Sequence, residues 1–542
     1  MDIPEIRHYV GQHLNKPALV VAVTVCKSWN ATFTPFLYST IRWQTSNLTR
    51  KDTERQEIFR KHADYVRNMT LKCHSITESD FTAPNQFTRL EGVDMSFTMT
   101  SFARFWEWTV TFLIQNPRLN SLKLCFEDCY NRTDSIPSGF FKASSRSFQG
   151  LRTLRLFHGL YRLKDLVLLF RETSEVLEEL YLNGISIHDL TSYSITKEDA
   201  LADLQFPHEF PNLKTLSFVN EPLTFLQLAL VERSCQLRYL NWTLPDGVRH
   251  VVPITEMTKT LKQGCSLVVE LELWNDPLRD RDIAEVIEGI QPGLATISFN
   301  QSRFGPLALE PLLRQHAASL TDVSLSSKKF TVTSAMVQKI LTTCHQLMRF
   351  SADVLNARDI LGLADIDAED SESEDEGEEE GKNEGGGWVC TKLTFFEMFI
   401  CGLKDKPLSW HRGIFKQISK LECLEELYVG ACSGIKERTR RSVFRNKTIW
   451  DGLDMRLEAG LDNLSNLKQL VGVGFSYVKQ ELDEKDVQWM VTSWPNLRAV
   501  YGELDIERDE FVRLAAILEE RGISTTVDEP DSDYDELDFI LF

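Results

Sequence analysis

One short pattern, with apolar residues at its first, fourth and sixth positions, recurs along most of this chain. Its clearest copy runs from Leu177 to Leu182, with Leu180 at the fourth position. On a strand, the fourth and sixth residues point to one face and the fifth to the other. A single strand cannot bury that apolar face alone, whereas stacked neighbours can. The pattern therefore predicts a solenoid of stacked repeats.

Fourteen further copies keep the same spacing, and they begin at Val66, Leu90, Leu119, Leu151, Leu213, Leu237, Val268, Leu294, Leu320, Leu347, Leu393, Leu424, Leu467 and Leu497. Their mean period is about 31 residues, which leaves room for a helix after each strand. Apolar residues at helical spacing predict such helices at Phe102–Gln115, Leu163–Glu172, Leu223–Arg233, Arg281–Ile290, Pro306–His316, Ser334–Cys344 and Asp486–Trp494. We therefore predict an α/β fold, in which a curved parallel sheet carries helices on its outer side.

Composition is consistent with a solenoid in a reducing compartment. Hydrophobic residues make up 42% of the 542 positions, and the longest apolar run, Ala18–Cys26, is shorter than the roughly 18–20 residues of a membrane span. The N-terminus has no signal-peptide layout. Eleven cysteines form no C-x-x-C pair, so we expect reduced thiols instead of a zinc ribbon or a disulfide framework. We expect a soluble protein of the cytoplasm, the nucleus or both.

The net charge of −19 is concentrated in two segments. Residues 365–387 hold twelve acids and one lysine, and the tail 528–542 holds seven acids and no base. The first segment is predicted to be a disordered insertion within one repeat. The rest of the chain is nearly neutral, which argues against a nucleic-acid partner because binding phosphates needs a basic surface. Ser371, Ser373 and Ser532 each have an acid three residues on, so either they are phosphorylation sites or the insertion is only solubilising.

Residues 1–43 do not follow the repeat. They predict three short helices, at Ile3–Leu14, Ala18–Val23 and Val25–Tyr38. Their apolar residues resemble the F-box pattern L-P-x-E-I…L-x-x-x-D-L…V-C-[RK]-x-W, through Pro4-Glu5-Ile6, Leu14, Leu19, Val25-Cys26-Lys27-Ser28-Trp29 and Leu37-Tyr38. Ile3 and Ala18 stand where the pattern has leucine and aspartate, and Glu5 follows the proline directly. The alternative is an ordinary helical cap over the first repeat.

Proteins of the F-box and leucine-rich-repeat family place such a module directly before a solenoid. The resemblance implies that the module docks on the adaptor subunit of a cullin-based (SCF-type) ubiquitin ligase. The residues it implies for this role are divided between the adaptor contact and the module's own core, and they are Pro4, Ile6, Val10, Leu14, Leu19, Val25 and Trp29. It also implies that the solenoid holds a target protein, which the sequence does not identify. The chain then comprises the module 1–43, a connecting helix or linker 44–65, the repeats 66–527 with their acidic insertion 365–387, and the acidic tail 528–542.

Aromatic residues occur at repeat positions that point away from the core. The third, fifth and seventh residues of each repeat are expected on the water-facing side of the sheet, where aromatic rings favour protein recognition. The candidates for contact with a target are Phe157, Tyr181, Tyr239, Trp274, Phe395, Phe399, Tyr428 and Tyr501. For each of them the alternative is packing under a loop or against a neighbour.

Motifs of enzymes are missing from the sequence. It contains no G-x-x-x-x-G-K-[ST], no H-E-x-x-H and no G-x-S-x-G, and its histidines have no metal-ligand spacing. We therefore expect no catalytic residue, no cofactor and no metal. A rival to the ligase receptor is a scaffold without a ligase, or a histone-binding protein that uses the acidic segments.

Overall fold

The computed structural model describes most of the chain. The described residues are 4–44, 61–73, 87–127, 136–137, 139–187, 205–220, 224–245, 253–274, 277–327, 331–362, 387–430, 452–476, 478–505 and 507–526. The acidic tail and its Ser532, the insertion with Ser371 and Ser373, and most of the connecting segment lie outside them. The chain forms two compact units, Met1–Leu267 and Val268–Phe542, and each is described by itself.

The first unit begins with a three-helix module. Its helices are α1 (Pro4–His13), α2 (Lys16–Val25) and α3 (Lys27–Leu37), which confirms the three predicted helices. The core of the module is small, because only Leu19, Ala22 and Phe33 are fully buried, and Leu14, Val23, Phe36 and Leu37 pack against them. A Cβ atom at Gly11 would lie 2.7 Å from the ring of Phe36, so a glycine there lets α1 approach α3 closely.

Parallel strands follow the module in the first unit. In pairing order they are β1 (Thr40–Gln44), β2 (Asn68–Cys73), β3 (Gly92–Thr98), β4 (Ser121–Glu127), β5 (Thr153–Phe157), β7 (Glu179–Asn183), β9 (Thr215–Val219) and β10 (Tyr239–Thr243). A separate pair joins β6 (Leu160–Tyr161) to β8 (Ser186–Ile187). The repeat helices are α5 (Met99–Gln115), α6 (Phe140–Ser144), α7 (Leu163–Thr173), α9 (Phe225–Glu232) and α10 (Ile254–Gly264), with 3₁₀ helices η2 (Ala63–Tyr65) and η5 (Ser145–Phe148).

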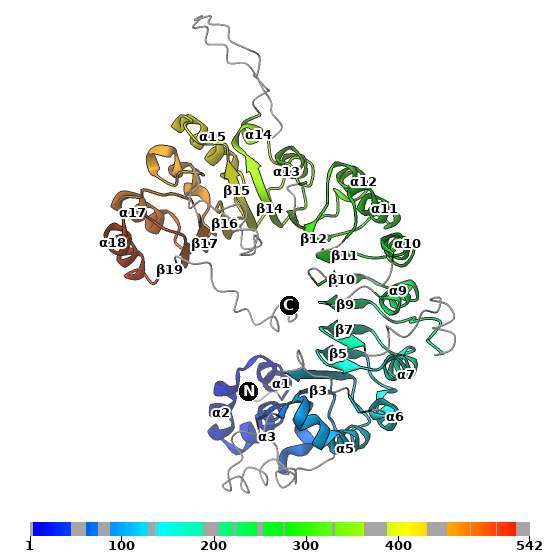
Figure 1. The fold of residues 1–542 in the computed structure, drawn as a ribbon. Helices are drawn as coiled ribbons and strands as arrows, with labels where there is room; N and C mark the ends of the chain where they lie inside the picture. The colour runs from blue at the N-terminus through cyan, green and yellow to red at the C-terminus, as the bar shows by residue number, and fades with distance from the viewer. Residues whose placement is uncertain are drawn as a thin grey trace, which may run out of the picture. The chain divides into compact units, whose positions relative to one another are not determined.

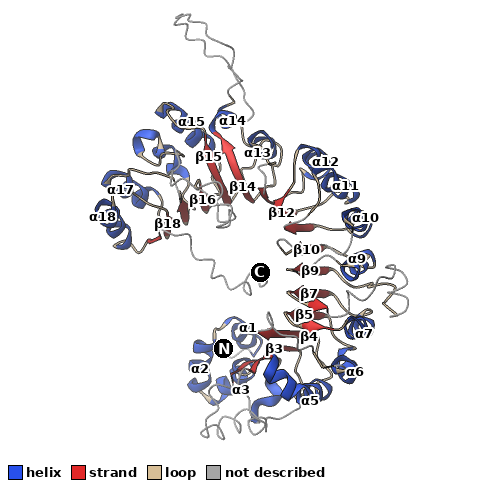
Figure 2. Ribbon diagram, viewed as in Figure 1, coloured by secondary structure: helices blue, strands red, loops and turns tan. Residues whose placement is uncertain are grey.

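The second unit repeats this plan. Its parallel strands are β11 (Glu270–Trp274), β12 (Thr296–Ser302), β13 (Asp322–Ser327), β14 (Arg349–Asn356), β15 (Phe395–Cys401), β16 (Glu426–Tyr428), β17 (Gly472–Gly474), β18 (Ala499–Tyr501) and β19 (Ser524–Thr526). The helices are α11 (Asp280–Gly289), α12 (Pro306–His316), α13 (Ser334–Leu341), α14 (Ala357–Leu361), α15 (Leu408–Ile418), α17 (Glu484–Ser493) and α18 (Arg508–Glu519), with η7 (Leu457–Ala459) and η8 (Leu461–Asn466). In each unit the repeat helices follow one side of the sheet (Figures 1 and 2).

Strand alternation places the core between sheet and helices. The fourth and sixth residues of the repeats lie opposite their counterparts on the next strand, as Leu154 does with Leu180 and Leu271 with Ile297, and they are buried. The backbone also repeats one contact, in which two successive amides donate to the same carbonyl of the preceding repeat. Glu178 N and Glu179 N, for example, donate to Arg152 O over 2.8 and 2.9 Å.

The structure confirms the predicted architecture and extends it. Fourteen of the fifteen repeat copies supply a parallel strand in the predicted register, and a helix lies at each of the seven predicted places. The copy at Leu467 is displaced by three residues, because Gly472 pairs with Glu426 and Val473 with Leu427. The sequence pattern did not predict β1, β19, α10, α15 or α18. Among the described residues no helix is both long enough and apolar enough to span a membrane.

Candidate functional site

Exposed apolar side chains are concentrated on the N-terminal module. Thirteen large apolar side chains are exposed among the described residues, and seven of them lie between residues 6 and 29, with exposed fractions of 38% to 65%: Ile6, Tyr9, Val10, Val20, Val21, Val25 and Trp29. On α1, the spacing of Ile6, Tyr9 and Val10 puts them on one helical face. Exposed apolar side chains gathered on one part of a protein are typical of a contact with another macromolecule.

The predicted docking residues divide between this surface and the core. Ile6, Val10, Val25 and Trp29 are exposed, whereas Leu19 is 4% exposed and belongs to the module's core, with Leu14 packed against it. Leu19 therefore stabilises the module, since an apolar side chain at this position of α2 faces α3. Nothing is described of the Pro4 side chain. Trp29 has both roles, because its ring meets that of the buried Phe33 at 5.4 Å.

The open face of each unit is the second surface available to a partner. We use this term for the sheet face that carries the third and fifth residues of the repeats, opposite the repeat helices. Tyr181, Tyr239, Phe395, Tyr428 and Tyr501 occupy such positions and are half-buried, as predicted for aromatic residues on this face.

Aromatic residues at the seventh repeat position are placed differently. Phe157 and Phe399 are only 2% and 8% exposed, so they belong to the core and are not presented to a partner. The Lys123 ammonium lies over the ring of Phe157 at 5.2 Å, and the segment at Gly452 approaches the ring of Phe399. Trp274, at the same repeat position, is half-buried and donates a hydrogen bond from Nε1 to Ser298 Oγ over 3.1 Å.

Charges on the open face of the first unit are paired within the face. Lys123 Nζ lies 3.2 Å from Asp94 Oδ2. The Arg155 guanidinium lies 3.8 Å from Glu179 Oε2 and stacks over the Tyr181 ring at 4.6 Å. Burial, followed by the nearby Glu179 carboxylate, raises the pKa of the Tyr181 hydroxyl, so this tyrosine stays neutral at physiological pH.

Carboxylates predominate on the open face of the second unit. They belong to Glu270, Glu272, Asp322, Glu397 and Glu426, and the basic residue at these positions is Arg349. Arg349 lies 3.4 Å from Asp322 and stacks over the Phe395 ring at 4.3 Å. Burial raises the pKa of Asp322 to about 6, with Arg349 opposing the shift and Glu270 adding to it.

Three aromatic rings form a row on this face, made possible by a glycine strand. The ring centroids of Phe395 and Tyr428 are 5.7 Å apart, and those of Tyr428 and Tyr501 are 5.6 Å apart. Strand β17 lies between the two tyrosines and contributes Gly472 and Gly474 to the face. A Cβ atom at Gly474 would lie 2.3 Å from Tyr428 Cδ1, so a larger residue there would displace the ring. We call Phe395, Tyr428 and Tyr501 the aromatic row.

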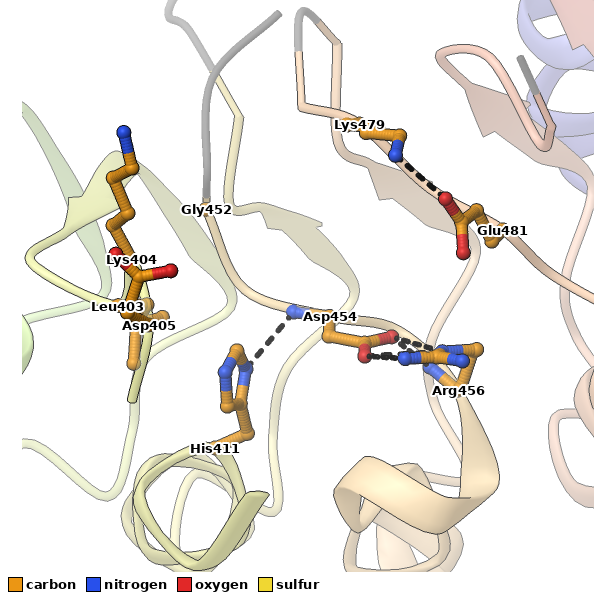
Figure 3. Close-up of a pocket in the computed structure, with 9 residues that line it drawn as sticks. All are labelled: Leu403, Lys404, Asp405, His411, Gly452, Asp454, Arg456, Lys479 and Glu481. Carbon is orange, nitrogen blue, oxygen red and sulfur yellow. Dashed lines mark hydrogen bonds and ion pairs between the residues drawn. The ribbon is translucent and has the colours of Figure 1, made fainter. Parts of the chain in front are cut away.

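A charged pocket lies away from the open face of the second unit (Figure 3). It has a volume of about 220 Å³ and is lined by Leu403, Lys404, Asp405, His411, Gly452, Asp454, Arg456, Lys479 and Glu481. Arg456 binds Asp454 through two nitrogens, and Lys479 pairs with Glu481 at 2.6 Å. The Asp454 amide donates to His411 Nδ1 over 3.1 Å, and burial lowers the pKa of His411, which favours the neutral ring.

These contacts give the pocket a structural role. The His411 hydrogen bond joins α15 to the segment before η7, and Gln480 joins that segment to the one after η8 through Leu453 and Met455. Each of the two ion pairs holds one of these segments internally. The Arg456 guanidinium donates hydrogen bonds to the Asp454 carboxylate, and this pairing raises the pKa of the guanidinium above its ordinary value. In the described part of the chain, no group of three or more His, Cys, Asp or Glu side chains is arranged to hold a metal ion.

Comparisons with known proteins were made at the level of sequence and of fold. No protein-family model matches the chain, and no curated protein matches its sequence. In fold, the chain is similar to a leucine-rich-repeat protein of Leptospira interrogans, with 13% identity and a TM-score of 0.42 over 90% of this chain and 99% of that one. It is also similar to the yeast Rad7–Elc1 complex, with 14% identity and a TM-score of 0.35 over 90% of each chain.

A third similar structure is the TLR13–ssRNA13 complex, with 13% identity and a TM-score of 0.31 over 79% of this chain and 51% of that one. The fold is a leucine-rich-repeat solenoid, and its assignment rests on the parallel register and the buried repeat positions of the chain itself.

The sequence located the aromatic residues of the open face but not the groups that surround them. The glycines of β17 were not visible in the predicted register, because the copy at Leu467 puts Gly472 at the sixth position, whereas its pairing with Glu426 puts it at the third. The carboxylates were visible, since the third and fifth residues of each repeat can be compared directly. Reading those two positions across the repeats is the signal that finds the carboxylates.

Proposed function

We propose that this chain is a protein-binding receptor. In this proposal the N-terminal module docks on the adaptor subunit of a cullin-type ubiquitin ligase, and the repeats hold the protein to be modified. The chain itself performs no covalent chemistry and acts in the cytoplasm or nucleus. Holding the target near the transferring subunits raises the effective concentration of its lysines, which accelerates transfer without any catalytic residue.

The observation that carries the proposal is the exposure of apolar side chains on the module. A capping element of a solenoid presents a polar outer face, because its purpose is to shield the core. This module instead exposes Val21, Val25 and Ile6 at 56% or more. Apolar side chains on helices are suited to insertion in a groove of a partner. The exposure therefore favours docking over capping, and the F-box resemblance names the kind of partner.

The test is co-purification of the adaptor with the full chain and with two matched variants. Val21→Glu introduces a charge on α2 at a side chain that is 65% exposed, and Val512→Glu does the same on α18, where the exposure is 59%. Loss of a docking contact typically weakens binding by about tenfold or more. We expect Val21→Glu to lose the adaptor and Val512→Glu to retain it, with both variants folded by circular dichroism.

Two outcomes would contradict this function. If the intact, folded chain does not retain the adaptor, residues 1–43 are a cap and the chain is a scaffold of another kind. If Val21→Glu and Val512→Glu retain the adaptor equally, docking does not use this surface. Repeating the measurement at high salt separates an apolar contact, which persists, from an ionic contact through the acidic segments, which weakens.

A further inference from the structure

The open face of the second unit combines negative charge with half-buried aromatic rings. Its third and fifth repeat positions carry five carboxylates and one guanidinium. Two of them are beside the aromatic row. Glu426 Oε2 accepts a hydrogen bond from the Tyr428 hydroxyl at 3.2 Å, and Glu397 Oε2 accepts one from Ser351 Oγ at 2.8 Å. Hydroxyl donors orient a carboxylate without adding positive charge.

Arg349 shows how this face binds a cation. Its guanidinium stacks over the Phe395 ring at 4.3 Å while it pairs with the Asp322 carboxylate at 3.4 Å. A planar guanidinium can stack on an aromatic ring and pair with a carboxylate at the same time, whereas an ammonium acts as a point charge. A ring and a carboxylate recur on the next strand, as Tyr428 with Glu426, and the Tyr501 ring on β18 lies 5.6 Å from that of Tyr428.

The titration of Tyr428 agrees with a negative potential at this place. Burial is the main cause that raises the pKa of its hydroxyl, and the carboxylates of Glu426 and Glu397 add to the shift. The same carboxylates favour a cation that approaches the ring.

We propose that the open face of the second unit binds an extended segment of a partner protein through arginine side chains, which stack on Tyr428 and Tyr501 and pair with Glu426 and Glu397. This inference rests on the proposed function only in naming that partner as the target. From β14 to β18 the face spans four strand spacings, or roughly 19 Å, which is the length of about six extended residues. The carboxylates repel phosphates, so the face does not suit a nucleic acid.

The test uses fluorescence anisotropy with the full chain at about 0.15 M salt. The probe is a labelled peptide of roughly eight residues in which arginine and glycine alternate. Two control peptides replace arginine by lysine or by citrulline, which keeps the shape of the side chain and removes its charge. We expect the arginine peptide to bind most tightly, the lysine peptide less tightly and the citrulline peptide not at all.

Three variants locate the binding. We expect Tyr428→Leu and Tyr501→Leu each to weaken the arginine peptide by roughly 5- to 30-fold, because each removes a ring on which a guanidinium stacks. Tyr181→Leu is the matched control, since Tyr181 occupies the fifth position of its repeat on the first unit's open face and is also half-buried. That variant should bind as the unchanged chain does.

Several results would overturn the proposal. One is absence of binding by the unchanged chain. Another is equal binding by Tyr428→Leu and Tyr181→Leu, which would assign the peptide to the acidic segments 365–387 and 528–542. A third is binding of the citrulline peptide as tight as that of the arginine peptide, because citrulline carries no charge. Because the adaptor is absent from this assay, failure here does not bear on docking by the module, and failure of docking does not bear on the peptide.

Discussion

The open faces of the two units have the same backbone and different chemistry. In the first unit, Lys123 pairs with Asp94 and Arg155 with Glu179, so most of the charge is balanced within the face. In the second unit carboxylates outnumber the single guanidinium, Arg349. The third and fifth repeat residues do not enter the core, so they can change without disturbing the buried leucines. The comparison teaches that the buried repeat positions determine the scaffold, whereas the third and fifth positions determine the charge and the aromatic content of each face.

The tyrosines of the two faces differ in the same way. Tyr181 in the first unit is covered by Arg155 of its own face, at 4.6 Å from the ring. Tyr428 in the second unit leans over the glycine strand β17 toward Tyr501. The first face therefore covers its tyrosine with its own arginine, whereas the tyrosines of the second face lie against each other across the glycines of β17.

The largest expected effect tests whether the glycine strand is what distinguishes the second face. Gly474→Ala places a Cβ atom 2.3 Å from a ring carbon of Tyr428, whereas Gly92→Ala in the first unit meets only the terminal oxygen of the exposed Asn68, at 2.5 Å. A ring packed in a row cannot yield as a terminal amide can. We expect Gly474→Ala to lower the free energy of unfolding by about 1–3 kcal/mol and Gly92→Ala to change it by less than about 0.5 kcal/mol. Urea titrations measure both, and equal losses would show that the row tolerates a side chain at β17.

A second prediction compares the two stacked arginines. The Arg155 side chain is 23% exposed and that of Arg349 is 53% exposed, although each stacks on a ring beside a carboxylate. Cation–π and ionic contacts are stronger where water is excluded. We expect Arg155→Ala to lower the free energy of unfolding by about 1–2 kcal/mol and Arg349→Ala by about 0.5–1 kcal/mol. The reverse order would contradict the view that the first face balances its charges internally.

Most of the fold was predictable, because a repeated pattern reports the same structure many times. The weak copy Leu467-Leu470-Gly472 located a strand but not its register, because Gly472 pairs with Glu426 and Val473 with Leu427. The missed strands have no such support. β1 belongs to the stretch that resembles an F-box, and β19 lacks the leucine spacing because it ends the sheet, where only one neighbour has to be paired. α10 and α15 do carry apolar residues at helical spacing, as at Met257 and Leu261, so the sequence contains a signal for both.

The candidate sites were predictable in part. Strand alternation placed Tyr181, Tyr428 and Tyr501 on the open face, because the period of two is fixed by the backbone. It did not predict the burial of Phe157, which ends its strand beneath Lys123, or of Phe399, whose ring is approached by the segment at Gly452. Which module residues face outward was also beyond the sequence. Leu19 and Val21 are both apolar residues of α2, and only the packing of α2 on α3 separates the buried one from the exposed one.

The smallest expected effect is a pH dependence confined to the second face. The pKa of Asp322 is raised from 3.8 to about 6 by burial, with Glu270 adding to the shift and Arg349 opposing it. Between these two pH values the folded chain holds a proton that the unfolded chain has released, so this group makes the free energy of unfolding fall as pH rises from about 4 to 6. Asp322→Asn removes that contribution. We expect the difference in unfolding free energy, unchanged chain minus variant, to fall by about 0.5 kcal/mol across this window, because a side chain that is 33% exposed is partly screened by solvent. Urea titrations at several pH values measure it, and a difference that stays flat or rises with pH would show that Asp322 is ionised throughout.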